Sequence, residues 1–249
     1  DPRPSHVAIQ SCIRRTRIMP VYGTFAVTFG TGIRSISYMK KLLVILLCVF
    51  AVQFASLAAQ RDKDGFVTVF DGTDLARLET KGNWKIEKDG SLHLVPREGE
   101  SGWKRYGSYL WLKGRYGDFT CDFEFKLGKG GNSGFYFRIS DKSDATLHGF
   151  EVQLKDDFGK EELGPHDVGC MIKTSGPLVN AVKPAGEWNR MVVALKGSHL
   201  FVSLNGQTVQ DVNMEDNKPE DKALAKKGWI AIQDHGEEFW VRNIKIKTP

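Results

Sequence analysis

The sequence predicts an all-β protein, built as a two-sheet antiparallel sandwich of the jelly-roll kind. Three observations support this fold class. About a dozen short segments alternate between apolar and polar residues, and turn residues separate them at intervals of roughly 8–12 residues. No stretch carries a helical period long enough for a βαβ unit. The chain has 249 residues, of which 41% are hydrophobic, and this suits one large β domain.

The first 59 residues are predicted to precede this domain. Met39-Lys40-Lys41 is followed by an apolar run over 42–52 and by small residues over 55–59, as in a secretory signal peptide. We therefore expect a signal peptide over 39–59, with cleavage after Ala58 or Ala59, and a periplasmic or secreted protein. The apolar run is too short to span a membrane, and no span is expected after cleavage. Residues 1–38 are interpreted as an over-extended start or a disordered extension, and 60–249 as a single domain.

The charge and the cysteine content limit the binding partners, disulfides and metal sites that the sequence predicts. Seven of the 35 basic residues and one of the 30 acidic residues fall within 1–59, so the domain is close to neutral and no nucleic-acid partner is expected. Cys121 and Cys170 follow the predicted signal peptide. They could form a disulfide or remain buried free thiols, and the sequence does not decide between these alternatives. No Cys/His spacing indicates a zinc site, so no metal ligand is assigned and a divalent-metal requirement stays open. The oligomeric state is also left open.

The strands follow in order along the domain. The clearest covers 116–127, where Phe119, Cys121, Phe123 and Phe125 are predicted to face inward. Asn205-Gly206 between two alternating runs predicts a hairpin. Residues 213–227 are polar and are predicted to form a loop with one helical turn at 221–226, and Trp188 is predicted to be a core residue. The predicted strands are 66–70, 84–87, 91–94, 108–112, 116–127, two within 130–158, a weaker one at 167–173, then 188–195, 199–204, 207–212, 229–233 and 239–247.

The stretch 130–158 holds the two strands that point to a function. In the first, Phe135, Phe137 and Ile139 alternate with Gly134, Tyr136 and Arg138. In the second, Phe150, Val152 and Leu154 alternate with Gly149, Glu151 and Gln153. Each strand therefore offers an apolar face and a face of planar hydrogen-bonding groups, which is typical of a sugar site. The alternative is a solvated outer face of an antiparallel sheet.

The acids and histidines limit the chemistry. A glycosidase of the laminarinase type needs two carboxylates, but the residues that share the face of Glu151 are Gln153 and Lys155. An ordinary two-carboxylate glycosidase is therefore disfavoured, although a partner from a distant strand stays open. His148 directly precedes the Glu151 strand. Further along, alternation places Ala231, Gln233 and His235 on one face, with Ile230 and Ile232 in the core; a solvent-facing role for that polar face is the alternative.

Four segments together resemble the 3-keto-disaccharide (3-keto-glucoside) hydrolase domain family. They are FVTVFDGTDL, GGNSGFYFR with HGFEVQLKDD, KPAGEWNRMVVALKG with LNGQTV, and GWIAIQDHGEEFWVRNIKIK. Their order and spacing fit over about 65–248. The resemblance implies a concanavalin-like or laminarinase-like sandwich. It also implies an exported protein that acts on a sugar already oxidised to a ketone at C3. Where the family tends to carry Gly-Ala-(Ile/Leu)-Tyr, this chain reads Gly169-Cys170-Met171-Ile172 and lacks the aromatic residue.

Such a reaction needs one base, donors that steady an enolate oxygen, and an acid for the leaving group. We predict Glu151 as the base, with His235 or His148 as the alternative base or the acid. No cofactor is expected, and the partner is a small-molecule carbohydrate. The predicted substrate-binding residues are Asn132, Arg138 and Gln153 as donors, Tyr136 as a stacking or donating group, and Gln233 on the neighbouring strand. The alternative function is a non-catalytic, lectin-like carbohydrate-binding module.

Overall fold

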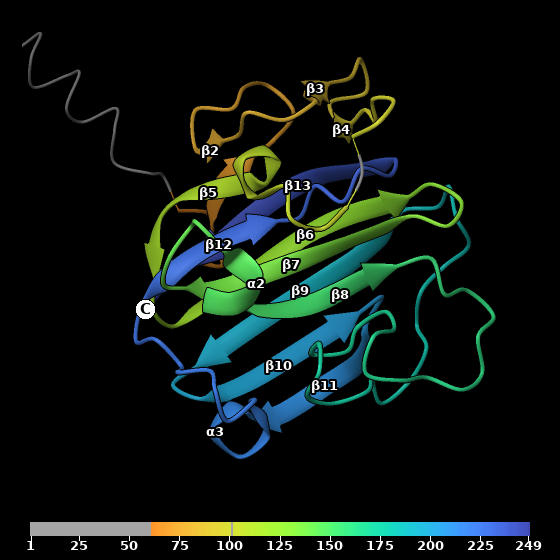
Figure 1. Cartoon of the computed structure of the whole chain (residues 1–249). Helices are drawn as coiled ribbons and strands as arrows, with labels where there is room; N and C mark the ends of the chain where they lie inside the picture. Colours follow the sequence, from red (N-terminus) through yellow and green to blue (C-terminus); the bar gives the residue numbers. More distant parts are fainter. Residues whose placement is uncertain (1–60, 101) are drawn as a thin grey trace, which may run out of the picture. The chain divides into compact units, whose positions relative to one another are not determined.

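The computed structural model describes residues 61–100 and 102–249. The predicted signal peptide at 39–59 and the extension at 1–38 lie outside the described residues. The described part consists of two antiparallel sheets packed face to face, with few helical turns (Figure 1), which confirms the all-β sandwich. Within 61–100 and 102–249, no helix is long and apolar enough to cross a membrane.

The larger sheet has eight strands, all joined by antiparallel pairing. In spatial order it contains β11 (Gln207–Asn213), β10 (His199–Leu204), β9 (Asn189–Lys196), β6 (Phe119–Leu127), β13 (Phe239–Lys247), β4 (Leu92–Leu94) and β3 (Trp84–Ile86), while β1 (Val67–Phe70) also pairs with β13. The hairpin predicted at Asn205-Gly206 joins β10 to β11, and Asn205 takes the left-handed φ of 51° that this tight turn requires.

The smaller sheet has five strands and carries the polar face of interest. Its spatial order is β2 (Leu78–Glu79), β5 (Leu110–Tyr116), β12 (Gly228–Ile232), β7 (Asn132–Ile139) and β8 (Phe150–Lys155). Three short helical segments accompany the sheets: the 3-10 turn η1 (Tyr106–Ser108), α2 (Ala145–His148) and α3 (Met214–Asn217). Figure 1 shows α2 beside β7 and β8, where the loop from β7 turns back into β8.

The core lies between the two sheets and is rich in phenylalanine. Phe119, Phe123 and Phe125 of β6 are buried, as is Cys121, which confirms the predicted inward face. The ring of Phe123 stacks on Phe135 of β7 with centroids 5.3 Å apart, so the two inner faces meet directly. Burying such rings stabilises the sandwich by roughly 1.5–3 kcal/mol each through the hydrophobic effect.

Several local predictions are corrected. The strand predicted over 116–127 is two strands, because β5 ends at Tyr116 and β6 begins at Phe119. The helical turn forms at 214–217 rather than 221–226, where the Asn213 side chain accepts a hydrogen bond from the Glu215 N–H as an N-cap. Trp188 is not a core residue: it is partly exposed, and the Arg242 guanidinium lies 4.0 Å from its ring centroid. Cys121 and Cys170 are both buried free thiols.

The predicted strand at 167–173 is an irregular segment that covers the edge of β8. The Gly169 N–H donates to Gln153 O at 2.9 Å, and the Gln153 N–H donates to Cys170 O at 3.0 Å. The Ile172 N–H donates to Glu151 O at 3.1 Å. These bonds satisfy backbone groups that an edge strand would otherwise leave unpaired, and they bring the loop beside the polar face of β8.

A bulge at Arg138 interrupts the alternation of β7. Arg138 has a φ of 53°, in the left-handed region, and the register with β12 shifts between Trp229 and Ala231. As a result Ile139 packs beside Tyr136, in a small cluster on the outer face, instead of joining Phe137 in the core. Gly228 permits this close approach, since a Cβ there would lie 2.2 Å from the Arg138 carbonyl carbon.

We therefore expect Gly228→Ala to lower the free energy of unfolding by about 1–3 kcal/mol, the usual cost of overpacking. The matched control is Gly107→Ala, because a Cβ at Gly107 would meet no atom within 4 Å. Urea unfolding of both variants measures the difference. Equal midpoints for the two variants would contradict the close approach.

Candidate active site

A cavity of about 550 Å³ opens on the outer face of the five-stranded sheet, away from the core. Its floor comes from β7, β8 and the chain that follows β12, and its walls come from loops. The floor residues are Asn132, Tyr136, Glu151, Gln153, Gln233 and His235. The wall residues are Trp103, Asp144, Thr146, Leu147, Phe150, His166, Ile172, Lys173, Pro219, Asp221 and Lys222.

The floor is arranged around Gly134. In the β7–β8 ladder, Gly134 lies opposite Gln153, and Tyr136 lies opposite Glu151. A Cβ at Gly134 would lie 2.1 Å from Glu151 Oε1, so the space that a side chain would fill is occupied by the carboxyl group. On the other side, the Gln233 N–H donates to Gly134 O at 2.8 Å and extends the sheet past the end of β12. Gly134 therefore leaves room for the Glu151 carboxyl group, and its carbonyl joins the Gln233 segment to β7.

Glu151 is the acidic group of this floor. Tyr136 OH donates a hydrogen bond to Glu151 Oε2 at 2.5 Å. Burial disfavours the charged carboxylate and raises the pKa of Glu151 to about 7, while the Tyr136 hydrogen bond and the charges of His235 and Lys222 oppose that rise. Glu151 can therefore gain and lose a proton at neutral pH.

A tyrosine–glutamine network supports Glu151 from below. Gln233 Nε2 donates to Tyr109 OH at 3.0 Å and to Tyr136 OH at 3.3 Å. Tyr109 OH in turn donates to Trp103 O at 2.9 Å. Burial raises the pKa of Tyr136 well above its usual value, so this hydroxyl stays protonated and available as a donor. The network fixes the direction of the proton in the Tyr136–Glu151 bond.

His235 is the second titratable group of the floor. Its Nδ1 lies 2.6 Å from Glu237 Oε2, and its Nε2 lies 3.4 Å from Asn132 Nδ2. The hydrogen bond with Glu237 raises the pKa of His235, and this outweighs the lowering effect of burial. Nδ1 therefore carries the proton that faces Glu237, and Nε2 is the atom turned towards the floor.

A buried ion pair holds the loop that carries His235. Asp234 is fully buried, and Arg105 Nη1 donates to its Oδ1 at 2.7 Å. The Gly102 N–H donates to His235 O at 3.0 Å, which ties the segment before Trp103 to the same loop. Because breaking a buried pair leaves an uncompensated charge, this contact positions both His235 and Trp103.

Two amide oxygens of the floor are free to bind a ligand. Asn132 Oδ1 and Gln153 Oε1 are both inaccessible to solvent, and neither accepts a hydrogen bond from the described residues. Buried polar atoms are normally paired, because each unmade hydrogen bond costs about 1–3 kcal/mol. Since both residues line the cavity, a sugar hydroxyl can donate to these oxygens once the side-chain amides turn towards it.

The structure brings together six of the eight predicted site residues. Glu151, Gln153 and Tyr136 meet on one face as strand alternation predicts, and Asn132, Gln233 and His235 complete the floor. His148 does not line the cavity: it ends α2, and its backbone carbonyl accepts from the Ser140 N–H. The prediction of His148 as base or acid is therefore wrong for this site.

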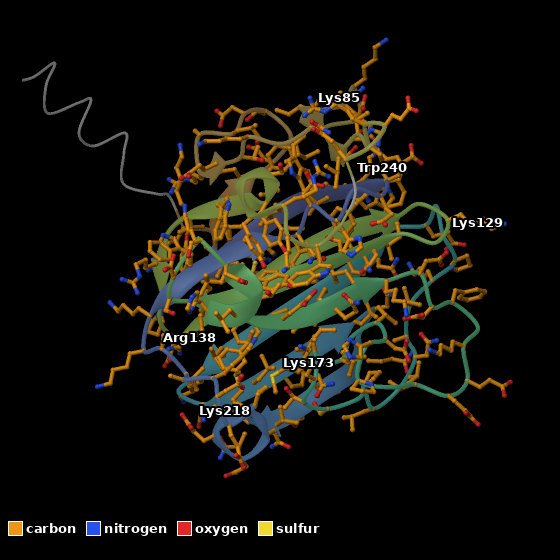
Figure 2. All side chains as sticks on the ribbon, in the orientation of Figure 1. Lys85, Lys129, Arg138, Lys173, Lys218 and Trp240 are labelled. Carbon is orange, nitrogen blue, oxygen red and sulfur yellow. The ribbon has the colours of Figure 1, made fainter. Side chains whose placement is uncertain are left out.

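The prediction that Arg138 contacts the sugar is also wrong. Its bulge turns the side chain away, and the guanidinium donates to the backbone oxygens of Ala225 and Lys226 and lies 3.3 Å from the Asp118 carboxylate. Figure 2 shows Arg138 well apart from Lys173, which belongs to the cavity wall. Arg138 is 4% exposed and serves to hold the 225–228 segment against β7.

Sequence reasoning missed Trp103, Lys173 and Lys222 because they lie on loops without a repeating pattern. Trp103 is 45% exposed at the cavity wall, and an exposed tryptophan is the one available signal for it. Ile172 also lines the cavity, at the position where the sequence lacks the expected aromatic residue. Across 61–100 and 102–249, no group of three or more His, Cys, Asp or Glu side chains is placed to hold a metal ion.

Comparisons with known proteins agree with this architecture. Residues 65–247 match the family described as 3-keto-alpha-glucoside-1,2-lyase-like domain. A protein of Bacteroides thetaiotaomicron named 3-keto-disaccharide hydrolase is 24% identical over 259 aligned residues, which cover 86% of each chain. Crystal structures of two candidate glycosyl hydrolases from Parabacteroides distasonis superpose with TM-scores of 0.61 and 0.62, at 26% and 28% identity. Each comparison covers 74% of this chain, and 94% and 99% of the respective other chain.

The raised pKa of Glu151 predicts a pH-dependent cost to stability. In the unfolded chain the carboxyl ionises near pH 4.5, whereas in the folded protein it ionises near pH 7, so stability falls as the pH rises between these values. Glu151→Gln removes this loss, and we expect its free energy of unfolding to exceed that of the native protein by about 2–3 kcal/mol at pH 8 and by much less at pH 5.

Urea unfolding at both pH values measures this effect. The control is Glu162→Gln, which changes an exposed loop glutamate in the same way and is expected to leave stability unchanged at both pH values. Equal stability of Glu151→Gln and the native protein at pH 8 would show that Glu151 is not held in a dehydrated environment.

Proposed function

The chain belongs to the 3-keto-alpha-glucoside-1,2-lyase-like domain family, and from this premise we propose that it cleaves the glycosidic bond of 3-keto-glycosides. The observation that carries the proposal is the presence of two titratable side chains in one cavity: Glu151, with a pKa of about 7, and His235, with a raised pKa. Both line one cavity with Asn132 and Gln153, whose amide oxygens accept no hydrogen bond from the described residues.

The chemistry of the substrate explains why one base is sufficient. A ketone at C3 makes the neighbouring C2–H acidic, because the electron pair left behind is shared with the carbonyl oxygen. A base of modest strength can therefore remove this proton. The glycosidic oxygen at C1 is then well placed to leave by elimination across C1 and C2, which is the 1,2-lyase reaction that the family description names.

Glu151 suits the role of this base. Its Oε2 is occupied by the Tyr136 hydroxyl, while Oε1 lies over the empty position of Gly134. Burial makes the ionised carboxylate a stronger base than an exposed glutamate, and a pKa near 7 leaves a large fraction ionised at neutral pH. The donor network through Tyr136 and Gln233 keeps the carboxylate in one orientation.

His235 suits the role of the acid for the leaving group. Glu237 holds the imidazole by Nδ1 and raises its pKa, which favours the protonated form, in which Nε2 can carry a proton towards the floor. Asn132 Nδ2 can donate to this nitrogen only while Nε2 is unprotonated, so their 3.4 Å contact is released when Nε2 carries the proton. An acid and a base at separate positions on the floor match the two ends of the eliminated bond.

The steps balance as a net hydrolysis. Glu151 takes the C2 proton, and the C2–H electron pair forms an enediolate with the charge on the C3 oxygen. The electron pair of the enediolate then forms the C1=C2 double bond as the C3 ketone is restored. The C1–O bond breaks, and the leaving oxygen takes a proton from His235. Water adds its hydroxyl to C1 and a proton to C2, which completes hydrolysis without a redox partner.

A two-carboxylate glycosidase is a weaker explanation of the same cavity. The other acids in the wall are Asp144 and Asp221. The Asp144 carboxylate accepts hydrogen bonds from Tyr106, Thr146 and the Leu147 N–H as the N-cap of α2, and hydrogen bonds of this kind lower its pKa. Asp221 is exposed on the loop after α3. Neither acid shares the dehydrated floor with Glu151.

We also propose that the protein acts after export, on the strength of residues 39–59 as a signal peptide. A periplasmic or secreted location suits an enzyme that meets glycans outside the cytoplasm. N-terminal sequencing of the protein recovered from its native cells tests this proposal, with cleavage after Ala58 or Ala59 as the expected result.

Turnover of a 3-keto-glucoside tests the proposed site. We expect Glu151→Gln to lower kcat by about 100–10,000-fold, because it removes the base, and His235→Asn to lower kcat by about 100-fold or more. The matched control is His199→Asn, since His199 also bonds a carboxylate at 2.6 Å but lies on the exposed β10–β11 surface.

Wild-type rates in both site variants, with intact folding, would overturn the assignment of Glu151 and His235. A protein that binds the sugar without converting it would instead be the lectin-like alternative. Calorimetric titration with the unoxidised glycoside distinguishes that outcome, because a lectin binds it without turnover.

The pH dependence of kcat/KM provides an independent check. Activity should fall on the acidic side as Glu151 becomes protonated near pH 7, and on the alkaline side as His235 loses its proton. Glu237→Gln removes the carboxylate that raises the pKa of His235, so the alkaline limb should move to lower pH while the acidic limb stays in place. An unchanged alkaline limb would exclude His235 as the acid.

A further inference from the structure

The proposed reaction builds negative charge on the C3 oxygen, and the floor contains no cation to meet it apart from His235. Arg138 was the predicted candidate, but its guanidinium lies outside the cavity. Among the described residues, the cationic side chains in the cavity wall are Lys173 and Lys222. A preorganised donor aimed at developing charge is commonly the largest single contribution to catalysis.

Lys222 is held firmly at one end of the Glu151 strand. Its Nζ donates to Gly149 O at 2.8 Å and also to Thr146 O. An ammonium group has three donors, so two are committed to carbonyl oxygens and one remains for a ligand. Gly149 directly precedes β8, which begins at Phe150, so this bond holds the ammonium group near the start of the strand that carries Glu151.

The surroundings of Lys222 increase its electrostatic effect. The side chain is half-buried and its Nζ lies 5.6 Å from the centroid of the Phe150 ring. Burial lowers the pKa of Lys222 and raises that of Glu151, and the charge of Lys222 acts on Glu151, so the two groups interact in partly dehydrated surroundings. Charge interactions in such an environment are several times stronger than in water.

From this geometry we propose that Lys222 is a catalytic residue that donates a charged hydrogen bond to the C3 oxygen of the sugar and stabilises the enediolate. The inference rests on the proposed function, because an enediolate forms only if Glu151 removes the C2 proton. Tyr136 and Lys222 then assist the same proton transfer from C2 in different ways. Tyr136 orients the base, Glu151, and Lys222 stabilises the negative charge on the C3 oxygen.

A purely structural role is the competing explanation. Thr146 O and Gly149 O are carbonyls at the end of α2, and a lysine near a helix C-terminus often caps such groups. A cap would stabilise the fold without affecting the chemical step. The two roles therefore differ in which kinetic constant the substitution changes.

The test is steady-state kinetics on a 3-keto-glucoside carrying either hydrogen or deuterium at C2. Lys222→Gln keeps donors for the two carbonyls but removes the charge, and Lys222→Arg keeps the charge. The control is Lys226→Gln, an exposed lysine of the same loop. We expect Lys222→Gln to lower kcat by about 100-fold with KM within about 3-fold of wild type, because the charge matters only once the enediolate forms.

The isotope effect and the other variants complete the prediction. The deuterium isotope effect of Lys222→Gln should equal or exceed that of the wild type, since proton removal becomes slower relative to the other steps. Lys222→Arg should retain more activity than Lys222→Gln, and Lys226→Gln should match the wild type. Circular dichroism melting of each variant measures the folded fraction and corrects the rates for it.

Three results would overturn the inference. One is a kcat of Lys222→Gln within about 3-fold of wild type, after correction for the folded fraction. The second is a loss of activity that appears only in KM, and the third is an isotope effect that falls towards unity. A wild-type protein that does not convert the 3-keto-glucoside would instead overturn the proposed function itself, so the two failures are distinguishable.

Discussion

The antiparallel register between β7 and β8 is the constraint on which the rest of the site depends. It places Tyr136 opposite Glu151 and Gly134 opposite Gln153, so the hydroxyl meets the carboxyl and the glycine leaves room for it. A shift of one residue would turn Glu151 into the phenylalanine core and bring the apolar residues of β8 to the surface. The packing of Phe135 on Phe123 opposes that shift, and the core thereby specifies the position of Glu151.

The site combines groups that destabilise the fold with groups that anchor it. Glu151 is kept partly dehydrated at a cost to stability, and this is also what gives it a pKa suited to taking a proton at neutral pH. Hydrogen bonds from two arginines stabilise the loops nearby. Arg105 bonds the buried Asp234, and Arg138 bonds the backbone of the loop that leads into β12. Both arginines therefore act on the site by holding loops in place and not by touching the sugar.

The floor and the walls of the cavity come from different kinds of structure. Its floor belongs to regular strands, where the spacing of side chains is set by the ladder. Its walls come mainly from the segments between strands, three of which carry Trp103, Lys173 and Lys222. Loops of this kind differ more readily between relatives than strands do. The strand ladder thus fixes the geometry of the floor, whereas the walls are free to vary in shape and charge.

The sequence by itself determined the sandwich, the phenylalanine core and the shared face of Tyr136, Glu151 and Gln153, because alternation along a strand is a local property with a period of two residues. It could not show the bulge at Arg138, since the left-handed residue arises from contact with Gly228, a residue distant in the sequence. Nor could it place Lys222, whose ammonium group is held by the carbonyl oxygens of Thr146 and Gly149. Tertiary structure decided both, because each depends on contacts between segments far apart in the chain.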